Sequence, residues 1–265
     1  DVKVSSEGKI VIVGSTDSGD SFPVTPGAYQ DASEGNVEAF VAVLDPDPSL
    51  SAEEQLLYST FLGGTENDAA VGAAWGPESS IYVTGHTMSV NFPTSTGAFD
   101  IVYDGGIDIF LARVLPDRSG DPSEQLLYST YLGGSSHDGW TWSNIYMQSF
   151  APDIVAGEDG VVTLAGCTQS NNFPTTPGTI GPNPLGGWDA YVLRLRPDGA
   201  LPPEQQLVVS TRFGGNGDDF AFGLSLEPPG YMYVRHDPEG LMQRDSYGTL
   251  PLNLLDARLA PGTTW

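Results

Sequence analysis

Cysteine is almost missing from this chain, since Cys167 is the single one among 265 residues. One thiol excludes an intrachain disulfide and a zinc site built on a cysteine cluster. Cys167 lies in an apolar strand pattern, where other copies of the same pattern carry a small residue. We therefore expect a buried structural thiol rather than a reactive one.

Basic residues are also scarce. Lys and Arg number 10 against 34 Asp and Glu, which gives a formal net charge of −24, and the two lysines are Lys3 and Lys9. Because a surface this negative repels a phosphate backbone, we expect no nucleic-acid partner. The charge indicates a solvated acidic surface and also favours divalent cations.

Long apolar runs are absent, so the sequence predicts no membrane span, and it shows no signal peptide. It begins at Asp1 rather than Met, from which we expect a processed, excised or partial chain. Long helix formers are few, whereas Gly and Pro number 33 and 21. This composition favours strands and turns over helices.

One nine-residue stretch occurs three times. It reads Leu-Leu-Tyr-Ser-Thr-Phe-Leu-Gly-Gly at 56–64, Leu-Leu-Tyr-Ser-Thr-Tyr-Leu-Gly-Gly at 126–134 and Leu-Val-Val-Ser-Thr-Arg-Phe-Gly-Gly at 207–215. Internal repetition at this spacing is typical of repeat architectures. It divides the chain into units at 1–64, 65–134, 135–215 and 216–265.

Each full unit carries signals for four strands. An apolar hairpin comes first, a Phe-Pro loop follows, and two further strands lead to the Gly-Gly corner. We expect the third strand of the first unit at 38–44 and the fourth strands at 55–62, 125–132 and 206–213. The fourth unit is eroded, with an expected third strand at 254–259 and no fourth strand. A four-stranded sheet cannot cover both of its own faces, so neighbouring units must cover them. The pattern predicts an all-β fold, a β-propeller of four-stranded antiparallel blades, about four in this chain, the last without its outer strand.

These motifs resemble the bacterial β-propeller repeat called the SBBP repeat. The resemblance rests on Tyr-Val-Thr-Gly at 82–85, Phe-Pro-Thr-Thr-Pro-Gly at 173–178, Asp-Ala-Tyr-Val at 189–192 and the three Gly-Gly stretches. It covers residues 1–215 closely and 216–265 in outline. It implies a secreted or cell-surface bacterial protein, often one module of a longer chain, with no shared catalytic residues.

Similarity to other propellers places the Leu-Leu-Tyr-Ser-Thr strand outermost in each blade. Unit four would then lack its outer strand, and an unpaired strand edge is a template for another chain. We expect the ring or partial ring to be completed by more of the same polypeptide or by a neighbouring subunit.

Three acidic residues follow the Gly-Gly corners at the same spacing, namely Asp68, Asp138 and Asp219. As hard oxygen ligands they predict a calcium site, and calcium is the one cofactor that the sequence suggests. The alternative is that each carboxylate accepts backbone N–H bonds and fixes the turn, which its presence in every full unit favours.

The second corner is followed by an aromatic insertion at 139–150. In an extended chain, Trp140, Trp142 and Tyr146 would point to one side, with Phe150 close behind. Such a row can stack on sugar rings or bind a protein partner. The alternative is that it packs on its own fold.

No catalytic signature is present. His86, His137 and His236 are scattered without metal-ligand spacing, and no nucleophile elbow surrounds a serine. The leading hypothesis is a non-enzymatic surface scaffold or adhesin that assembles with copies of itself or with adjoining domains. A carbohydrate-binding module that uses the aromatic insertion is the second, and an enzyme acting on extracellular polysaccharide is the third.

Overall fold

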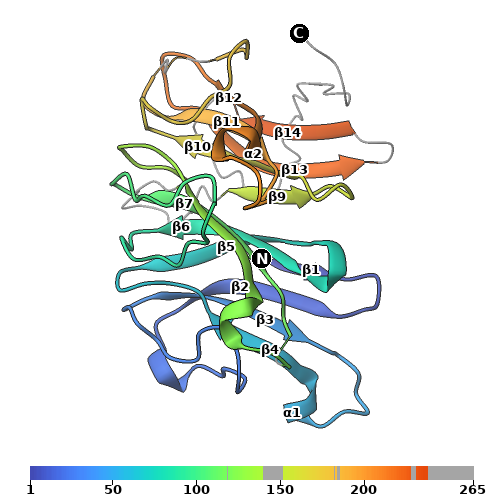
Figure 1. The fold of residues 1–265 in the computed structure, drawn as a ribbon. Helices are drawn as coiled ribbons and strands as arrows, with labels where there is room; N and C mark the ends of the chain where they lie inside the picture. The colour runs from blue at the N-terminus through green and yellow to red at the C-terminus, as the bar shows by residue number, and fades with distance from the viewer. Residues whose placement is uncertain (118, 140–151, 182, 184–185, 228–230, 238–265) are drawn as a thin grey trace, which may run out of the picture.

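The computed structural model describes residues 1–117, 119–139, 152–181, 183, 186–227 and 231–237 (Figure 1). The aromatic insertion from Trp140 to Phe150 lies outside the described residues. The third strand expected in unit four, at 254–259, also lies outside the described residues. So do the residues that follow it, where unit four was expected to have no fourth strand.

Three four-stranded sheets and one hairpin make up the described chain, each with its strands in sequence order and antiparallel (Figure 1). Sheet 1 contains β1 (Val2–Val4), β2 (Ile10–Thr16), β3 (Glu38–Leu44) and β4 (Leu56–Phe61). Sheet 2 contains β5 (Asp68–Trp75), β6 (Ile81–Thr87), β7 (Asp108–Val114) and β8 (Leu126–Leu132). Sheet 3 contains β9 (Asp153–Ala156), β10 (Val162–Thr168), β11 (Asp189–Leu195) and β12 (Leu207–Phe213). The hairpin contains β13 (Phe220–Glu227) and β14 (Tyr231–Asp237). The all-β class and the antiparallel four-stranded sheets are confirmed.

Helices are few and short in the described residues. They are α1 (Ala52–Gln55), α2 (Pro203–Gln206) and the 3-10 turns η1 (Gly19–Ser21), η2 (Pro77–Ser79) and η3 (Pro122–Gln125). No helix in this part of the chain has the length and apolar character needed to cross a bilayer.

The fourth strands begin one residue later than the sequence predicts. Gln55, Gln125 and Gln206 were expected in these strands, yet each ends a helical turn. The turn is set locally, because Ser51 and Glu54 form a capping box before β4 and Asp121 caps the turn before β8.

The repetition extends to the pairing register. The second and third strands pair over seven residues in every sheet, and the last two strands share one bulge position. The bulges lie at Val43/Leu44, Arg113/Val114 and Arg194/Leu195. Equal register places equivalent residues on equivalent faces, so the sheets can be compared position by position.

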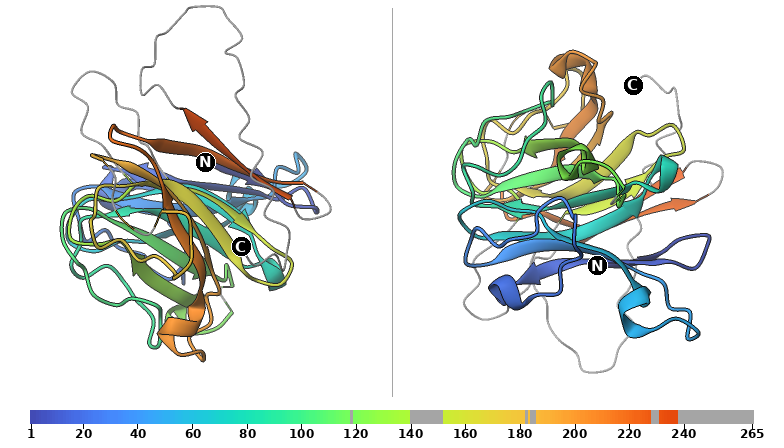
Figure 2. Two further views of the ribbon diagram at one scale, coloured as in Figure 1. Left: turned by 90° about the horizontal axis from the view of Figure 1, so that it is seen from above. Right: turned by 60° about the horizontal axis from the view of Figure 1, so that its bottom comes forward.

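The sheets are stacked, with sheet 2 between sheets 1 and 3 (Figures 1 and 2). One apolar core fills the space between sheets 1 and 2, and a second fills the space between sheets 2 and 3. A smaller cluster joins sheet 3 to β13. Covering the faces of sheet 2 from both sides removes its apolar side chains from water, which is the main stabilising term.

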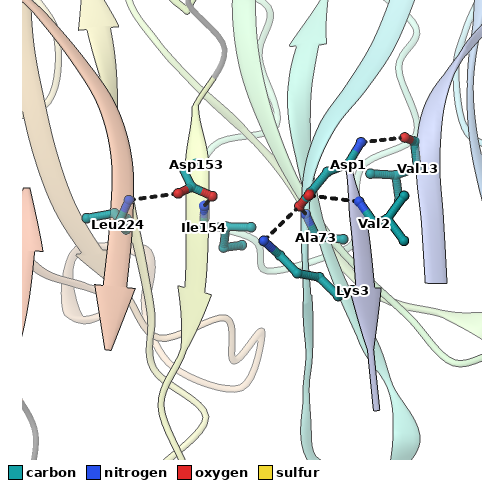
Figure 3. A network of polar contacts seen from close by, with 8 residues as sticks. All are labelled: Asp1, Val2, Lys3, Val13, Ala73, Asp153, Ile154 and Leu224. Atoms are coloured by element: carbon teal, nitrogen blue, oxygen red, sulfur yellow. Dashed lines mark hydrogen bonds and ion pairs between the residues drawn. The ribbon is translucent and has the colours of Figure 1, made fainter. Parts of the chain in front are cut away.

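The first strands of the sheets and of the hairpin lie side by side, in the order β1, β5, β9 and β13 (Figure 3). Two aspartates link them. Asp1 Oδ2 accepts a hydrogen bond from the backbone N–H of Ala73 at 3.1 Å, and Asp153 Oδ2 accepts one from Leu224 at 2.7 Å. These bonds link β1 to β5 and β9 to β13.

Candidate functional site at the joints between sheets

The Gly-Gly corners form three equivalent joints, each made from two successive units. In each joint, the first glycine lies between an acid at the start of a third strand and the acid that follows the corner. Joint 1 comprises Glu38, Gly63, Asp68 and Ser89, joint 2 comprises Asp108, Gly133, Asp138 and Ser170, and joint 3 comprises Asp189, Gly214 and Asp219.

The predicted acids Asp68 and Asp138 make the same hydrogen bonds. Asp68 Oδ2 accepts from the Gly64 N–H and from Ser89 Oγ, both at 2.8 Å. Asp138 Oδ2 accepts from Gly134 and Ser170 at the same distance. Each aspartate and its serine belong to the same unit, whereas the glycine N–H ends the preceding unit, so the carboxylate joins the corner to the following unit.

Asp219 makes the equivalent corner bond, with Oδ2 accepting from the Gly215 N–H at 2.7 Å. All three acids thus accept backbone N–H bonds at their corners. The structural interpretation of these residues, as acids that fix a turn, agrees with this geometry.

Only glycine fits at the centre of a joint. A Cβ on Gly133 would lie 2.8 Å from Asp108 Oδ1 and 2.9 Å from Asp138 Oδ2. Gly63 meets Glu38 and Asp68 in the same way, with even less room. The absent side chain lets two carboxylates approach one backbone from both sides.

One oxygen of each carboxylate in joints 1 and 2 is buried with no hydrogen-bond partner among the described residues. These atoms are Glu38 Oε2, Asp68 Oδ1, Asp108 Oδ1 and Asp138 Oδ1. No Lys or Arg of the described chain forms an ion pair with these four groups. A buried unpaired anion is costly, so the joints favour protonated carboxyls.

Burial is the largest cause of the resulting pKa shifts. It raises the pKa of Asp68 to about 6, of Asp138 to about 6 and of Asp108 to about 8. The neighbouring acid adds to two of these shifts, since Glu38 raises the pKa of Asp68 and Asp138 raises that of Asp108. At neutral pH, joint 2 therefore retains a proton.

Calcium at Asp68, Asp138 and Asp219 stays a prediction. The described residues contain no group of three or more His, Cys, Asp or Glu side chains arranged to hold a metal. Each joint offers two carboxylates, whereas calcium takes six to eight oxygen ligands.

A second repeated contact joins the sheets through tyrosine and glutamine. Tyr58 in sheet 1 donates its hydroxyl to Gln125 Oε1 at 2.8 Å, and Gln125 Nε2 donates to the Gly27 carbonyl at 2.7 Å. Tyr128 in sheet 2 and Gln206 repeat the arrangement, with a 2.6 Å bond between them. We call each such pair a latch.

Gln206 also donates to the carbonyl of Gly97, the equivalent of Gly27. Sequence reasoning missed both latches, because partners such as Tyr58 and Gln125 lie in different units. The available signal was the repetition of Gln before each Leu-Leu-Tyr or Leu-Val-Val stretch.

Two shallow clefts open between neighbouring sheets of the described chain. The larger, about 420 Å³, lies between sheets 1 and 2 and has Tyr29, Gln30, Asn91 and Asp121 in its wall. The other, about 370 Å³, lies between sheets 2 and 3 and has Tyr82 and Arg113 in its wall. Neither has a histidine or a cysteine among its described lining residues.

The other sequence candidates lie in different elements of the fold. His86 lies in β6, where burial lowers its pKa to about 4. His137 lies at joint 2, and nothing is described of the side chain of His236. The Cys167 thiol is fully buried in β10, as expected, and burial raises its pKa.

No protein-family model matches the chain. The regulatory protein FlaEY of Caulobacter vibrioides is 28% identical to it over 183 residues, which are 69% of this chain and 16% of that protein. The chain thus spans only a small part of the length of this curated relative.

Proposed function

We propose that this chain is a β-propeller or partial propeller of the SBBP-repeat type that acts as a non-enzymatic scaffold. In this proposal it is secreted or displayed on a bacterial cell surface, and it assembles with further modules or copies of itself. One observation carries the proposal: the repeated polar side chains of the described units are engaged in joining one sheet to the next.

The arrangement of the first strands supports a propeller. In a propeller, the innermost strand of each blade faces a common axis. Strands β1, β5, β9 and β13 are neighbours, while the Leu-Tyr-Ser-Thr strands β4 and β8 lie at the opposite sheet edges. This order is the one expected for blades that radiate from an axis.

Burial of the paired acids argues against a glycosidase that uses them. Hydrolysis of a glycosidic bond needs two carboxyl groups that touch the sugar. Glu38, Asp68, Asp108 and Asp138 are at most 1% exposed, so they cannot touch a polysaccharide. A carbohydrate-binding function would depend on Trp140 and Trp142, outside the described residues, and stays an alternative.

Sedimentation velocity over a wide concentration range, combined with negative-stain microscopy, tests the scaffold proposal. We expect oligomers or filaments of the purified chain, or of the longer polypeptide that contains it. A strictly monomeric protein that cleaves polysaccharide would contradict the proposal. Binding on a glycan array that is lost in Trp140→Ala and Trp142→Ala would favour the carbohydrate alternative.

A further inference from the structure

In sheets 2 and 3, one apolar face of the sheet is covered by the preceding sheet. The equivalent apolar face of sheet 1 has no such cover among the described residues. We call it the open face. In β2 and β3, Ile10, Ile12, Phe40 and Leu44 on this face are partly exposed. The open face consists of Val2, Val4, Ile10, Ile12, Phe40 and Leu44.

The equivalent positions in the other sheets are sealed. The counterparts of the four β2 and β3 residues are 0% exposed in both sheets: Ile81, Val83, Phe110 and Val114 in sheet 2, and Val162, Leu164, Tyr191 and Leu195 in sheet 3. At the first strand, Val2 is 55% exposed, whereas its counterparts Ala73 and Ile154 are 0% and 1% exposed. In sheets 2 and 3, the preceding sheet covers this face.

Gln55 has the position of a latch glutamine, but no tyrosine hydroxyl of the described residues bonds to it. It is the counterpart of Gln125 and Gln206, and its Nε2 still donates within its own unit to the Leu50 carbonyl at 3.2 Å. Its Oε1 accepts no hydrogen bond from any described residue, whereas Oε1 of Gln125 and of Gln206 accepts a tyrosine hydroxyl.

Ser18 carries part of a joint in the same way. Its backbone N–H bonds to Thr16 Oγ1 at 3.1 Å, as Ser89 bonds to Thr87 and Ser170 to Thr168 at 3.0 Å. The other two hydroxyls donate to Asp68 and Asp138, but the Ser18 hydroxyl meets no aspartate in the described chain and is exposed.

We propose that the open face docks a further four-stranded sheet of the same repeat chemistry, a deepening that rests on the proposed scaffold function. The docked sheet supplies a tyrosine hydroxyl to Gln55 from its last strand. The segment that follows its Gly-Gly corner supplies an aspartate to Ser18, and its apolar side chains cover Ile10, Ile12 and Phe40.

The occupant comes from outside these 265 residues. The three Gly-Gly corners of the repeated stretch already serve joints 1 to 3, and residues 238–265 contain no Gly-Gly pair. A second copy has its two latch tyrosines already engaged, and Val209 stands at the tyrosine position of sheet 3. The match to FlaEY covers 16% of that protein, so a related sequence lies within a much longer polypeptide.

The test adds the missing unit to the full chain. A copy of residues 65–134, followed by a copy of 65–71, is joined ahead of Asp1, which places the added aspartate at the spacing of joint 1. We expect Gln55→Ala to lower the melting temperature of this extended protein by about 2–4 °C and that of the original chain by less than about 1 °C.

Two controls identify the contact. Tyr→Phe at the position of Tyr128 in the added copy should lower the melting temperature similarly, without adding to the effect of Gln55→Ala. Gln125→Ala, whose latch is complete, should destabilise both proteins equally. Limited proteolysis should cleave the added unit no faster than the rest of the extended protein.

Three results would overturn the inference. They are an equal effect of Gln55→Ala in both proteins, which would place the occupant within the original chain, additive effects of the two latch variants, and selective proteolysis of the added unit. Self-assembly of the original chain is measured separately by sedimentation. A monomer there would contradict homotypic assembly while leaving the docking result intact.

Discussion

Strands β2 and β6 occupy equivalent positions in sheets 1 and 2 but differ in burial. In β2, buried and partly exposed residues alternate through Ile10, Val11, Ile12 and Val13. In β6, the corresponding residues from Ile81 to Thr84 are all buried. Both strands are apolar and share one register, so the difference comes from their neighbours. Sheet 2 is covered from two sides and sheet 1 from one.

The largest effect expected from this difference concerns one aromatic position. Phe110 in sheet 2 is 0% exposed and stacks on Phe92 with ring centroids 4.5 Å apart. Phe40, its counterpart, lies 4.7 Å from Phe22 but remains partly exposed. Phe110→Ala should lower the free energy of unfolding by about 3–5 kcal/mol and Phe40→Ala by about half as much. Equal losses in urea titrations would contradict the one-sided burial of sheet 1.

The joints should make stability depend on pH. Because burial holds the pKa values of Asp68 and Asp138 near 6 and that of Asp108 near 8, the folded chain binds protons that the unfolded chain has lost above about pH 4. The free energy of unfolding should therefore fall by about 1–3 kcal/mol between pH 4 and 8.

Variants at the two joints sharpen the comparison. Asp108→Asn should remove more of this pH slope than Glu38→Gln in joint 1, because the pKa of Asp108 is raised further. Urea titrations at several pH values measure both slopes. Stability that rises with pH, or a slope unchanged in Asp108→Asn, would contradict the shared proton at joint 2.

The next prediction compares the latch glutamine Gln125 with its counterpart Gln55 in sheet 1. Gln125→Ala leaves the buried Tyr58 hydroxyl without its acceptor and should cost about 1–2 kcal/mol. In the unextended chain, the matched Gln55→Ala removes no bond between sheets and should cost less than about 0.5 kcal/mol. Thermal melts of the two variants compare them directly, and the idea fails if Gln55 proves as costly as Gln125.

The smallest effect concerns chemical access rather than stability. Cys167 in β10 is 0% exposed, whereas Ser15 at the same position in β2 is exposed. A Ser15→Cys variant should react within seconds with a thiol reagent, while native Cys167 should react only as fast as the protein opens. Fast labelling of Cys167 would show that sheet 3 is less covered than described.

The sequence predicted the repeated sheets because their signals are local. Alternating apolar residues, Gly-Gly corners and Pro loops lie within single units, and β3 covers the predicted residues Glu38–Leu44. The contacts between units were not predictable in this way. Tyr58 and Gln125 are 67 residues apart, and Gln125 reads as part of a strand although it ends a helical turn.

The candidate site was predicted in part. The equal spacing of Asp68 and Asp138 from their corners indicated one shared role, and the structure adds their partners Glu38 and Asp108. Two features were invisible in the sequence: the proximity of these acids across Gly63 and Gly133, and the one-sided burial of sheet 1. Each depends on how separate units pack together.

Because each joint is built from residues of two successive units, a chain of this kind can lengthen by whole units. One unit supplies the glycine, the first acid and the latch tyrosine, and the next supplies the second acid, the serine and the glutamine. A tandem duplication of a gene segment that encodes one unit therefore delivers both halves of a new, matching boundary in a single event. A point mutation at one boundary, by contrast, requires a compensating mutation in the neighbouring unit. The sequences of adjacent units therefore diverge in a coupled way.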